Sequence, residues 1–255
     1  MEIDFRKWKG GHVMRPVIGI TGAWSVETWG HSEEHGGYFY VGSYYATAVS
    51  KSGGLPFIIA LPHKNADLKE VAEEVVSRVD GILFSGGGDA KRFKKDELPS
   101  LYEQQPFRYS FERELILEAW KRDLPILGIC RGYQMLVEVF GGKLMDGTID
   151  GHKQNLPGHE PWHALFIKED SKFERLVGTR EMRVNSFHIQ AVEKVPKGFE
   201  AVGLSDDGII EAIEAVDKEF VFGVQFHPEE RYDVDPHSKV IFDHFVEKAR
   251  EYKMR

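Results

Sequence analysis

The chain has 255 residues, of which 42% are hydrophobic and 29% charged, a composition typical of a globular protein. Its 41 acidic and 33 basic residues give a formal net charge of -8, which argues against nonspecific nucleic-acid binding because that requires a basic face. No stretch approaches 18 uninterrupted apolar residues, so we expect no membrane span. The single cysteine excludes an internal disulfide, and the N-terminus lacks the apolar core of a signal peptide. Together these features predict a cytoplasmic protein.

The first 142 residues alternate between strand-like and helix-like patterns. Short apolar, β-branched runs that end at turn residues predict strands at 16–22, 55–62, 81–88 and 124–130. Between them, amphipathic runs predict helices at 40–54, 66–80, 107–123 and 131–142. Strands that alternate with helices of this length indicate βαβ units and a mostly parallel sheet covered on both faces.

The remainder of the chain has a different pattern. Shorter strands are predicted in succession at 162–168, 181–187, 198–204, 208–216 and 220–226, followed by a helix at 238–253. The loop from Thr148 to Pro161 is polar and rich in glycine, histidine and proline, so we expect it to be mobile. Without repeats or a long linker, the sequence indicates one α/β domain over 1–255, with 1–15 as an N-terminal extension.

The only cysteine, Cys130, lies where an apolar run stops and an amphipathic run begins. The surrounding residues 128–132 read G-I-C-R-G, the thiol counterpart of the strained strand-to-helix turn that presents serine in G-x-S-x-G hydrolases. At a helix N-terminus the dipole favours thiolate, and the amide of Arg131 would form half of an oxyanion hole. The alternative is a buried structural cysteine, since free cysteine is among the most buried residue types.

A candidate base for this thiol follows a later strand, in the segment FVFGVQFHPEE. His227 comes at the end of the apolar run, as expected for a residue at the carboxyl end of a parallel sheet. If the segment is extended, Glu229 projects to the same side and accepts a hydrogen bond from the imidazole. The alternative is a surface histidine in a turn. The glycine run that begins at Gly86 supplies the second oxyanion amide, for which we favour Gly87, although such a run is commonly just a turn.

Four segments, GICRGYQ, SGGGD, VNSFHIQAV and GVQFHPE, occur in this order and resemble class I glutamine amidotransferase-like hydrolases. The resemblance is strongest to the γ-glutamyl-γ-aminobutyrate hydrolase, or peptidase-like, branch. It implies a three-layer, flavodoxin-like α/β fold and a Cys–His–Glu triad at Cys130, His227 and Glu229. It also implies cleavage of a γ-glutamyl amide through a thioester, with release of glutamate. The residues that it assigns to the glutamyl group are Gln134, Asn185, Ser186 and His188.

The alternative for Asn185 and His188 is a strand end with satisfied polar groups. Two segments depart from the family. After the glycine run the chain continues Asp89-Ala90-Lys91-Arg92, where the branch often has Asp-Val-Asp-Pro, which leaves the leaving-group preference open. Residues 22–37 match no family motif, and Trp24 and Trp29 there either shape the amine pocket or pack.

Three functions compete on this evidence. The first is a stand-alone hydrolase of a small-molecule γ-glutamyl substrate, and the second is a glutaminase subunit that delivers ammonia to a separate synthase partner. The third is a metal-binding or interaction protein, suggested by two polar clusters: His152, His159, Glu160 and His163; and Asp233, Asp235 and His237. Neither cluster has a tight ligand spacing such as H-E-x-x-H. We therefore expect no metal and no cofactor, and the sequence leaves a homo-oligomer open.

Overall fold

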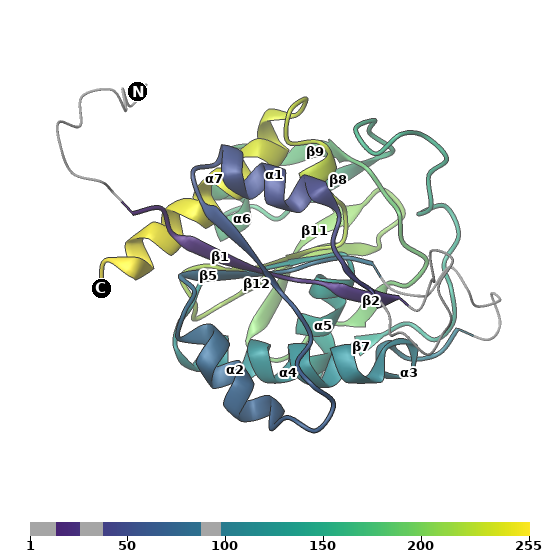
Figure 1. Cartoon of the computed structure of the whole chain (residues 1–255). Helices are drawn as coiled ribbons and strands as arrows, with labels where there is room; N and C mark the ends of the chain where they lie inside the picture. Colours follow the sequence, from purple (N-terminus) through teal and green to yellow (C-terminus); the bar gives the residue numbers. More distant parts are fainter. Residues whose placement is uncertain (1–13, 26–37, 88–97) are drawn as a thin grey trace, which may run out of the picture.

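A central sheet organises the protein, whose computed structural model describes residues 14–25, 38–87 and 98–255 (Figure 1). Its strand order is β4-β1-β5-β6-β13-β12-β11-β8-β9. The first five strands pair in parallel: β4 (Leu55–Ile59), β1 (Val17–Thr21), β5 (Gly81–Phe84), β6 (Ile126–Ile129) and β13 (Val221–Val224). This parallel block matches the βαβ pattern of the first 142 residues, completed by one strand from the C-terminal part.

The sheet continues beyond β13 as an antiparallel extension. Its strands are β12 (Ile210–Ala215), β11 (Phe199–Ser205), β8 (His163–Ile167) and β9 (Glu181–Val184), with β10 (Val192–Lys194) and β7 (Lys143–Leu144) attached beside β12. A separate two-stranded sheet joins β2 (Ala23–Ser25) to β3 (Tyr38–Tyr40). The succession of short strands predicted from the sequence therefore forms the antiparallel half of the sheet.

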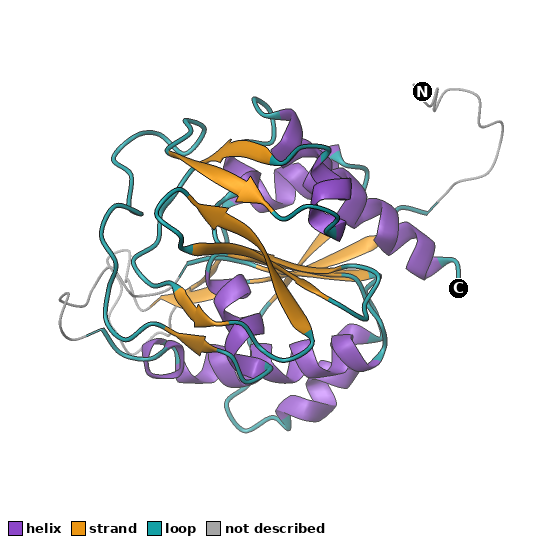
Figure 2. Ribbon diagram, turned by 180° about the vertical axis from the view of Figure 1, so that it is seen from behind, coloured by secondary structure: helices purple, strands orange, loops and turns teal. Residues whose placement is uncertain are grey.

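Helices cover both faces of the sheet and make the three layers visible in Figures 1 and 2. One face carries α1 (Ser43–Lys51), α6 (Lys172–Val177) and α7 (Pro236–Lys253); the other carries α2 (Leu68–Val76), α3 (Leu101–Gln104), α4 (Pro106–Lys121) and α5 (Arg131–Val139). A buried apolar cluster fills the space between the sheet and each helix layer. Within the described ranges, no helix combines the length and apolar composition that a membrane span requires.

The predicted α/β architecture is confirmed, with differences in its short elements. The pattern missed α6, β7 and β10, which have six, two and three residues and are too short to show a period. The loop predicted to be mobile packs against the protein, where His152 and Gln154 are buried. Residues 1–13, Trp29 and the segment 89–92 lie outside the described residues.

The register of the parallel strands decides where functional groups meet. Phe84 of β5 and Gly223 of β13 both pair with Gly128 of β6, so the three strands end at the same edge. Since the carboxyl ends of parallel strands form the ligand-binding edge of such sheets, the loops after these strands bring Gly87, Cys130 and His227 together.

Candidate active site

Cys130 lies on a strained turn between β6 and α5. Its backbone angles are φ 52° and ψ -105°, a conformation that side-chain-bearing residues rarely adopt and that persists where the surroundings enforce it. A Cβ on Gly128 would lie 2.8 Å from the carbonyl oxygen of Gly132, and one on Gly132 would overlap the carbonyl oxygen of Phe84. The paired glycines are therefore sterically required, and the turn leaves Cys130 only partly buried.

His227 hydrogen-bonds to Glu229 and, together with Cys130, lines one cavity. Its Nδ1 lies 2.6 Å from Glu229 Oε1, so Nδ1–H donates to the carboxylate. The prediction of an extended segment was wrong, because Pro228–Glu230 forms a 3₁₀ turn. This tight turn brings the Glu229 carboxylate back to the His227 ring. The predicted contact is therefore present, although the backbone between the two residues is not extended.

The charge environment of His227 favours the imidazolium. Burial by itself lowers the pKa of His227, but the negative charges of Glu229 and Cys130, with the hydrogen bonds to both, raise it well above its ordinary value. His227 is therefore suited to hold its proton as an imidazolium beside Glu229.

The loop after β5 is fixed by two residues that sequence reasoning missed. Gly86 N–H donates to Tyr45 Oη over 3.0 Å, and the same Oη lies 3.5 Å from His227 Nδ1. The Arg108 guanidinium donates to the carbonyl oxygens of Gly87, at 3.0 Å, and of Ser85 and Gly86. Gly87 itself has φ +83°, the left-handed region that favours glycine. No local pattern marks Tyr45 or Arg108, because they reach this loop from α1 and α4.

A buried ion cluster supports the start of α5. Glu112 receives hydrogen bonds from Thr21 Oγ1 and Arg108 Nε, each at 2.8 Å, and from Arg131. Burial raises the pKa of Glu112, but the two guanidinium charges outweigh it and leave the pKa below its ordinary value. The Arg131 side chain is therefore engaged with Glu112, and the group it offers beside Cys130 is its backbone amide.

A cavity of about 340 Å³ opens in front of Cys130. Of the residues predicted to bind the glutamyl group, Gln134 and His188 line it. Gln134 Nε2 donates to Gln225 Oε1 at 2.9 Å, which fixes the amide at the cavity wall. The other lining residues are Gly87, Leu101, Gln104, Arg131, Lys153, Phe187, Ile189, Gln190, His227 and Glu230.

Asn185 and Ser186 lie behind this cavity and are fully buried. The Asn185 side chain brackets the backbone of His227: Oδ1 accepts from His227 N–H at 2.8 Å, and Nδ2 donates to His227 O at 3.0 Å. Ser186 Oγ donates to the carbonyl oxygen of His152 at 2.8 Å. These contacts match the alternative of a satisfied strand end for Asn185, whose amide positions the histidine.

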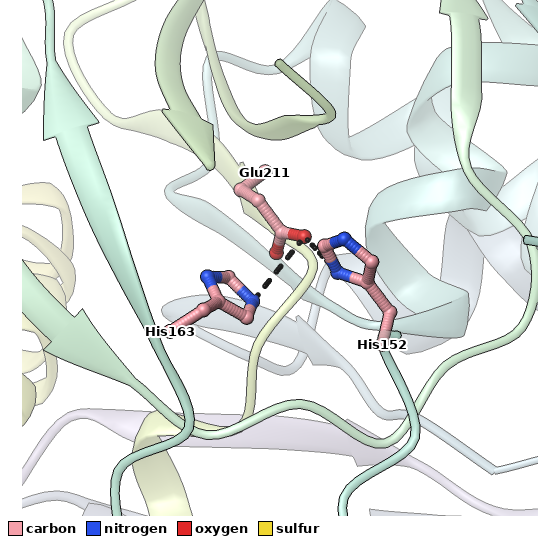
Figure 3. Close-up of side chains that lie close together, drawn as sticks. All are labelled: His152, His163 and Glu211. Carbon is pink, nitrogen blue, oxygen red and sulfur yellow. Dashed lines mark ion pairs between the residues drawn. The ribbon is translucent and has the colours of Figure 1, made fainter. Parts of the chain in front are cut away.

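Neither polar cluster noted in the sequence stays together as a group in the fold. His159 and Glu160 are exposed and pair with each other at 3.4 Å, whereas His152 and His163 are buried and meet Glu211, which no local spacing indicated (Figure 3). In the second cluster, Asp233 pairs with Lys51. Asp235 caps α7 through Ser238 N–H, and His237 contacts the carbonyl oxygen of Val177.

Comparison with known proteins gives the family. The Peptidase C26 profile matches residues 16–229, so the chain belongs to the peptidase C26 family of class I glutamine amidotransferase-like cysteine hydrolases. The "Putative glutamine amidotransferase PB2B2.05" of Schizosaccharomyces pombe is 33% identical over 214 residues, covering 81% of each chain. The γ-glutamyl-γ-aminobutyrate hydrolase PuuD of Escherichia coli K12 is 30% identical over 220 residues, covering 79% of this chain and 83% of that protein.

The fold also matches a solved structure from Thermoplasma acidophilum, described as "a putative gmp synthase subunit a protein". The TM-score is 0.61, and the match covers 94% of this chain and 97% of that one. At 17% sequence identity this likeness shows the class I glutamine amidotransferase fold alone.

Proposed function

We propose that this protein hydrolyses γ-glutamyl amides through a thioester on Cys130 and releases glutamate. The observation that carries the proposal is that Cys130 and His227 line one cavity while His227 hydrogen-bonds to Glu229; we call these three residues the catalytic series. Family membership and the 30% identity to a γ-glutamyl-γ-aminobutyrate hydrolase support the same reaction.

In the acylation step, the Cys130 thiolate attacks the amide carbon of the substrate. The carbonyl oxygen becomes negative, and the amides of Arg131 and Gly87 donate hydrogen bonds to it. The His227 imidazolium then gives its proton to the nitrogen of the leaving amine, the C–N bond breaks, and a thioester remains. Glu229 keeps the imidazole oriented throughout.

Deacylation reverses these roles. Neutral His227 accepts a proton from a water molecule that attacks the thioester carbon, and the two amides again bind the oxyanion. The C–S bond breaks, glutamate leaves, and the thiolate–imidazolium pair is restored. Water replaces the amine in the second step, so no cofactor is required to balance the reaction.

The cavity suits the α-amino acid end of a glutamyl group. Lys153 and Glu230 both line it, with the amide side chains of Gln104 and Gln134. A cation and a carboxylate in the same lining complement the carboxylate and ammonium of a zwitterion, because charge-assisted hydrogen bonds are among the stronger polar contacts. We therefore propose that the glutamyl group binds in this cavity through its α-amino acid end.

The glutaminase alternative shares this acylation chemistry and differs in the fate of ammonia. A relative at 33% identity is named a putative glutamine amidotransferase. The experiment must therefore distinguish a glutaminase subunit from a stand-alone hydrolase. The test is a panel of γ-glutamyl amines with glutamine as comparator, scored for glutamate release by the isolated chain. Faster turnover of γ-glutamyl amines than of glutamine supports the hydrolase. Activity with glutamine that needs an added partner protein supports the glutaminase.

Cys130→Ala tests the nucleophile in the same assay. The variant should lose at least about 10⁴-fold in kcat/KM, the loss expected when a covalent nucleophile is removed. Its thermal unfolding should match that of the parent, because the thiol is only partly buried. Activity retained within tenfold of the parent would remove Cys130 from the mechanism.

A further inference from the structure

A second cluster of histidines lies outside the catalytic series, at the antiparallel half of the sheet. His152 comes from the loop before β8, His163 begins β8, and Glu211 lies within β12. All three side chains are at least nine-tenths buried. Figure 3 shows both imidazoles directed at the Glu211 carboxylate, with His152 Nδ1 3.1 Å and His163 Nε2 3.7 Å from Oε1. A third histidine, His188, approaches the same oxygen with Nε2 at 3.1 Å.

The outer nitrogen of each imidazole fixes its tautomer. His163 Nδ1 lies 2.9 Å from the carbonyl oxygen of Ala164, and His188 Nδ1 lies 2.9 Å from that of Gln190. A carbonyl oxygen accepts only, so both Nδ1 atoms carry the proton. His152 Nε2 lies 3.0 Å from the Asp207 carboxylate, which again requires N–H on the outer side. Each neutral ring therefore turns a lone pair toward Glu211.

With neutral rings, the imidazole nitrogens and the Glu211 carboxylate oxygen that they face are all hydrogen-bond acceptors. Among the described residues, His163 Nε2 and Glu211 Oε2 are buried without a hydrogen-bond partner. Buried acceptors without a donor cost about 1–3 kcal/mol each. Protonation of one ring would supply one donor and leave the other lone pairs facing the carboxylate. A cation bound between His152, His163 and Glu211 would take an electron pair from one atom of each.

The spacing and chemistry of these donors fit a divalent transition metal. Bond lengths of 2.0–2.1 Å in a tetrahedral zinc site put neighbouring ligand atoms about 3.4 Å apart. The two nitrogen-to-carboxylate distances of 3.1 and 3.7 Å lie on either side of that value. Metal-bound histidines usually donate their other N–H to a carboxylate or carbonyl, as His152 does to Asp207 and His163 does to Ala164.

An approach to the cluster is also present. A cavity of about 380 Å³ borders His152 and His163, and Asp206 and Asp207 line it. The two carboxylates would attract a cation, and the cavity leaves room for water as a further ligand.

We propose that His152, His163 and Glu211 bind one divalent transition metal ion of the Zn²⁺ type. The ion would tie the loop before β8 to β8 and β12. Through His188, which contacts Glu211 and also lines the catalytic cavity, it would stiffen one wall of that cavity. The expectation of no metal rested on the lack of a tight ligand spacing, and Glu211 lies too far from His152 and His163 in the chain to have supplied one.

The first experiment measures Zn²⁺ binding to the full chain after chelator treatment and dialysis, by titration and elemental analysis. We expect one Zn²⁺ per chain and a rise in the thermal unfolding temperature on binding. His163→Gln should weaken Zn²⁺ affinity by at least about 100-fold, more than the loss of an outer partner. His159→Gln, at an exposed histidine of the same loop, should bind as the parent does. The absence of Zn²⁺ binding by the parent, or equal binding by His163→Gln, would overturn the proposal in favour of a protonated cluster.

A second measurement needs no variant at the cluster. X-ray absorption of the Zn²⁺-loaded parent should show nitrogen and oxygen ligands at about 2.0–2.1 Å. A sulfur ligand at about 2.3 Å would place the ion on Cys130 instead and contradict the proposal. Cys130→Ala should keep full Zn²⁺ affinity while it loses hydrolysis, so failure of the metal site and failure of the hydrolase proposal give different results.

Discussion

The protein contains two groups in which imidazoles contact a carboxylate: His227 with Glu229, and His152 and His163 with Glu211. The two groups differ in whether the ring nitrogen that faces the carboxylate is a hydrogen-bond donor. In the proposed catalytic series, His227 donates Nδ1–H to Glu229 and lines the same cavity as Cys130. In the buried cluster, His152 and His163 donate their N–H outward and turn lone pairs inward to Glu211. In the first arrangement a proton lies between His227 and Glu229. In the second, neutral rings leave no proton between the imidazole nitrogens and the Glu211 carboxylate.

The sheet explains why the two groups differ. The catalytic series occupies the carboxyl edge of parallel strands, where loops leave in one direction and an open cavity forms. The histidine cluster lies in the antiparallel half of the sheet, where β11 separates β8 from β12 and His152 joins from the loop before β8. On these two proposals, the anchor of the second ring nitrogen would separate a proton-transfer histidine from a metal-binding one.

Glu229→Gln should produce the largest change within this comparison. The variant keeps the shape but loses the charge that orients His227, so kcat/KM should fall by about 10²–10⁴-fold, less than for Cys130→Ala. The charge of Glu229 raises the pKa of His227, so its removal lowers that pKa. The alkaline limb of the pH–activity profile should move to lower pH, since the imidazolium is lost earlier as pH rises.

The control for this prediction is Glu160→Gln, which removes an exposed carboxylate paired with His159 and should keep the parent profile. An unshifted alkaline limb in Glu229→Gln would mean that Glu229 does not set the charge of His227. Zn²⁺ affinity should be unchanged in Glu229→Gln, which separates the two groups experimentally.

Much of the architecture could be predicted because its signals are local. Strand and helix periods gave the parallel block, and the G-x-C-x-G string marked the turn at Cys130 because the steric demand falls on adjacent residues. The same applies to His227 and Glu229, two residues apart, although the turn between them is 3₁₀ and not extended.

The contacts that support the site could not be predicted, because they join distant segments. Tyr45 on α1 reaches Gly86 after β5, and Arg108 on α4 reaches the same loop. Glu211 gave no signal at all, since on sequence alone it is one acidic residue in an alternating strand. The role of Glu211 depends on which histidines the antiparallel strands and the loop before β8 bring into contact with it.

His188→Gln should give an intermediate effect, because His188 belongs to both regions. Its Nε2 contacts Glu211 and His152, at 3.1 and 3.2 Å, and its ring lines the catalytic cavity. We expect Zn²⁺ affinity to fall, because the neutral His188 ring turns a further lone pair toward the ion that Glu211 would bind. KM should rise while kcat changes less, because the residue lies at the cavity wall and not at the reacting atoms. Parent values for both quantities would show that the two regions are uncoupled.

Tyr45→Phe should give the smallest effect on catalysis and a measurable effect on stability. The substitution removes the hydroxyl that accepts Gly86 N–H and lies 3.5 Å from His227 Nδ1, and leaves a buried N–H without its partner. Such a loss costs about 1–3 kcal/mol of the free energy of unfolding, which urea denaturation would measure. Since the hydroxyl contacts the ring nitrogen that Glu229 already holds and is not itself a proton carrier, kcat should fall by less than about tenfold.

Tyr44→Phe is the matched control, because the neighbouring tyrosine is 57% exposed and its hydroxyl exchanges freely with water. Stability should then stay within about 0.5 kcal/mol of the parent, as for an ordinary surface substitution. Equal destabilisation of the two variants would mean that the Gly86 loop is not fixed by Tyr45. A loss of activity in Tyr45→Phe as large as that in Glu229→Gln would make the tyrosine a participant in proton transfer, and the catalytic series would then have four members.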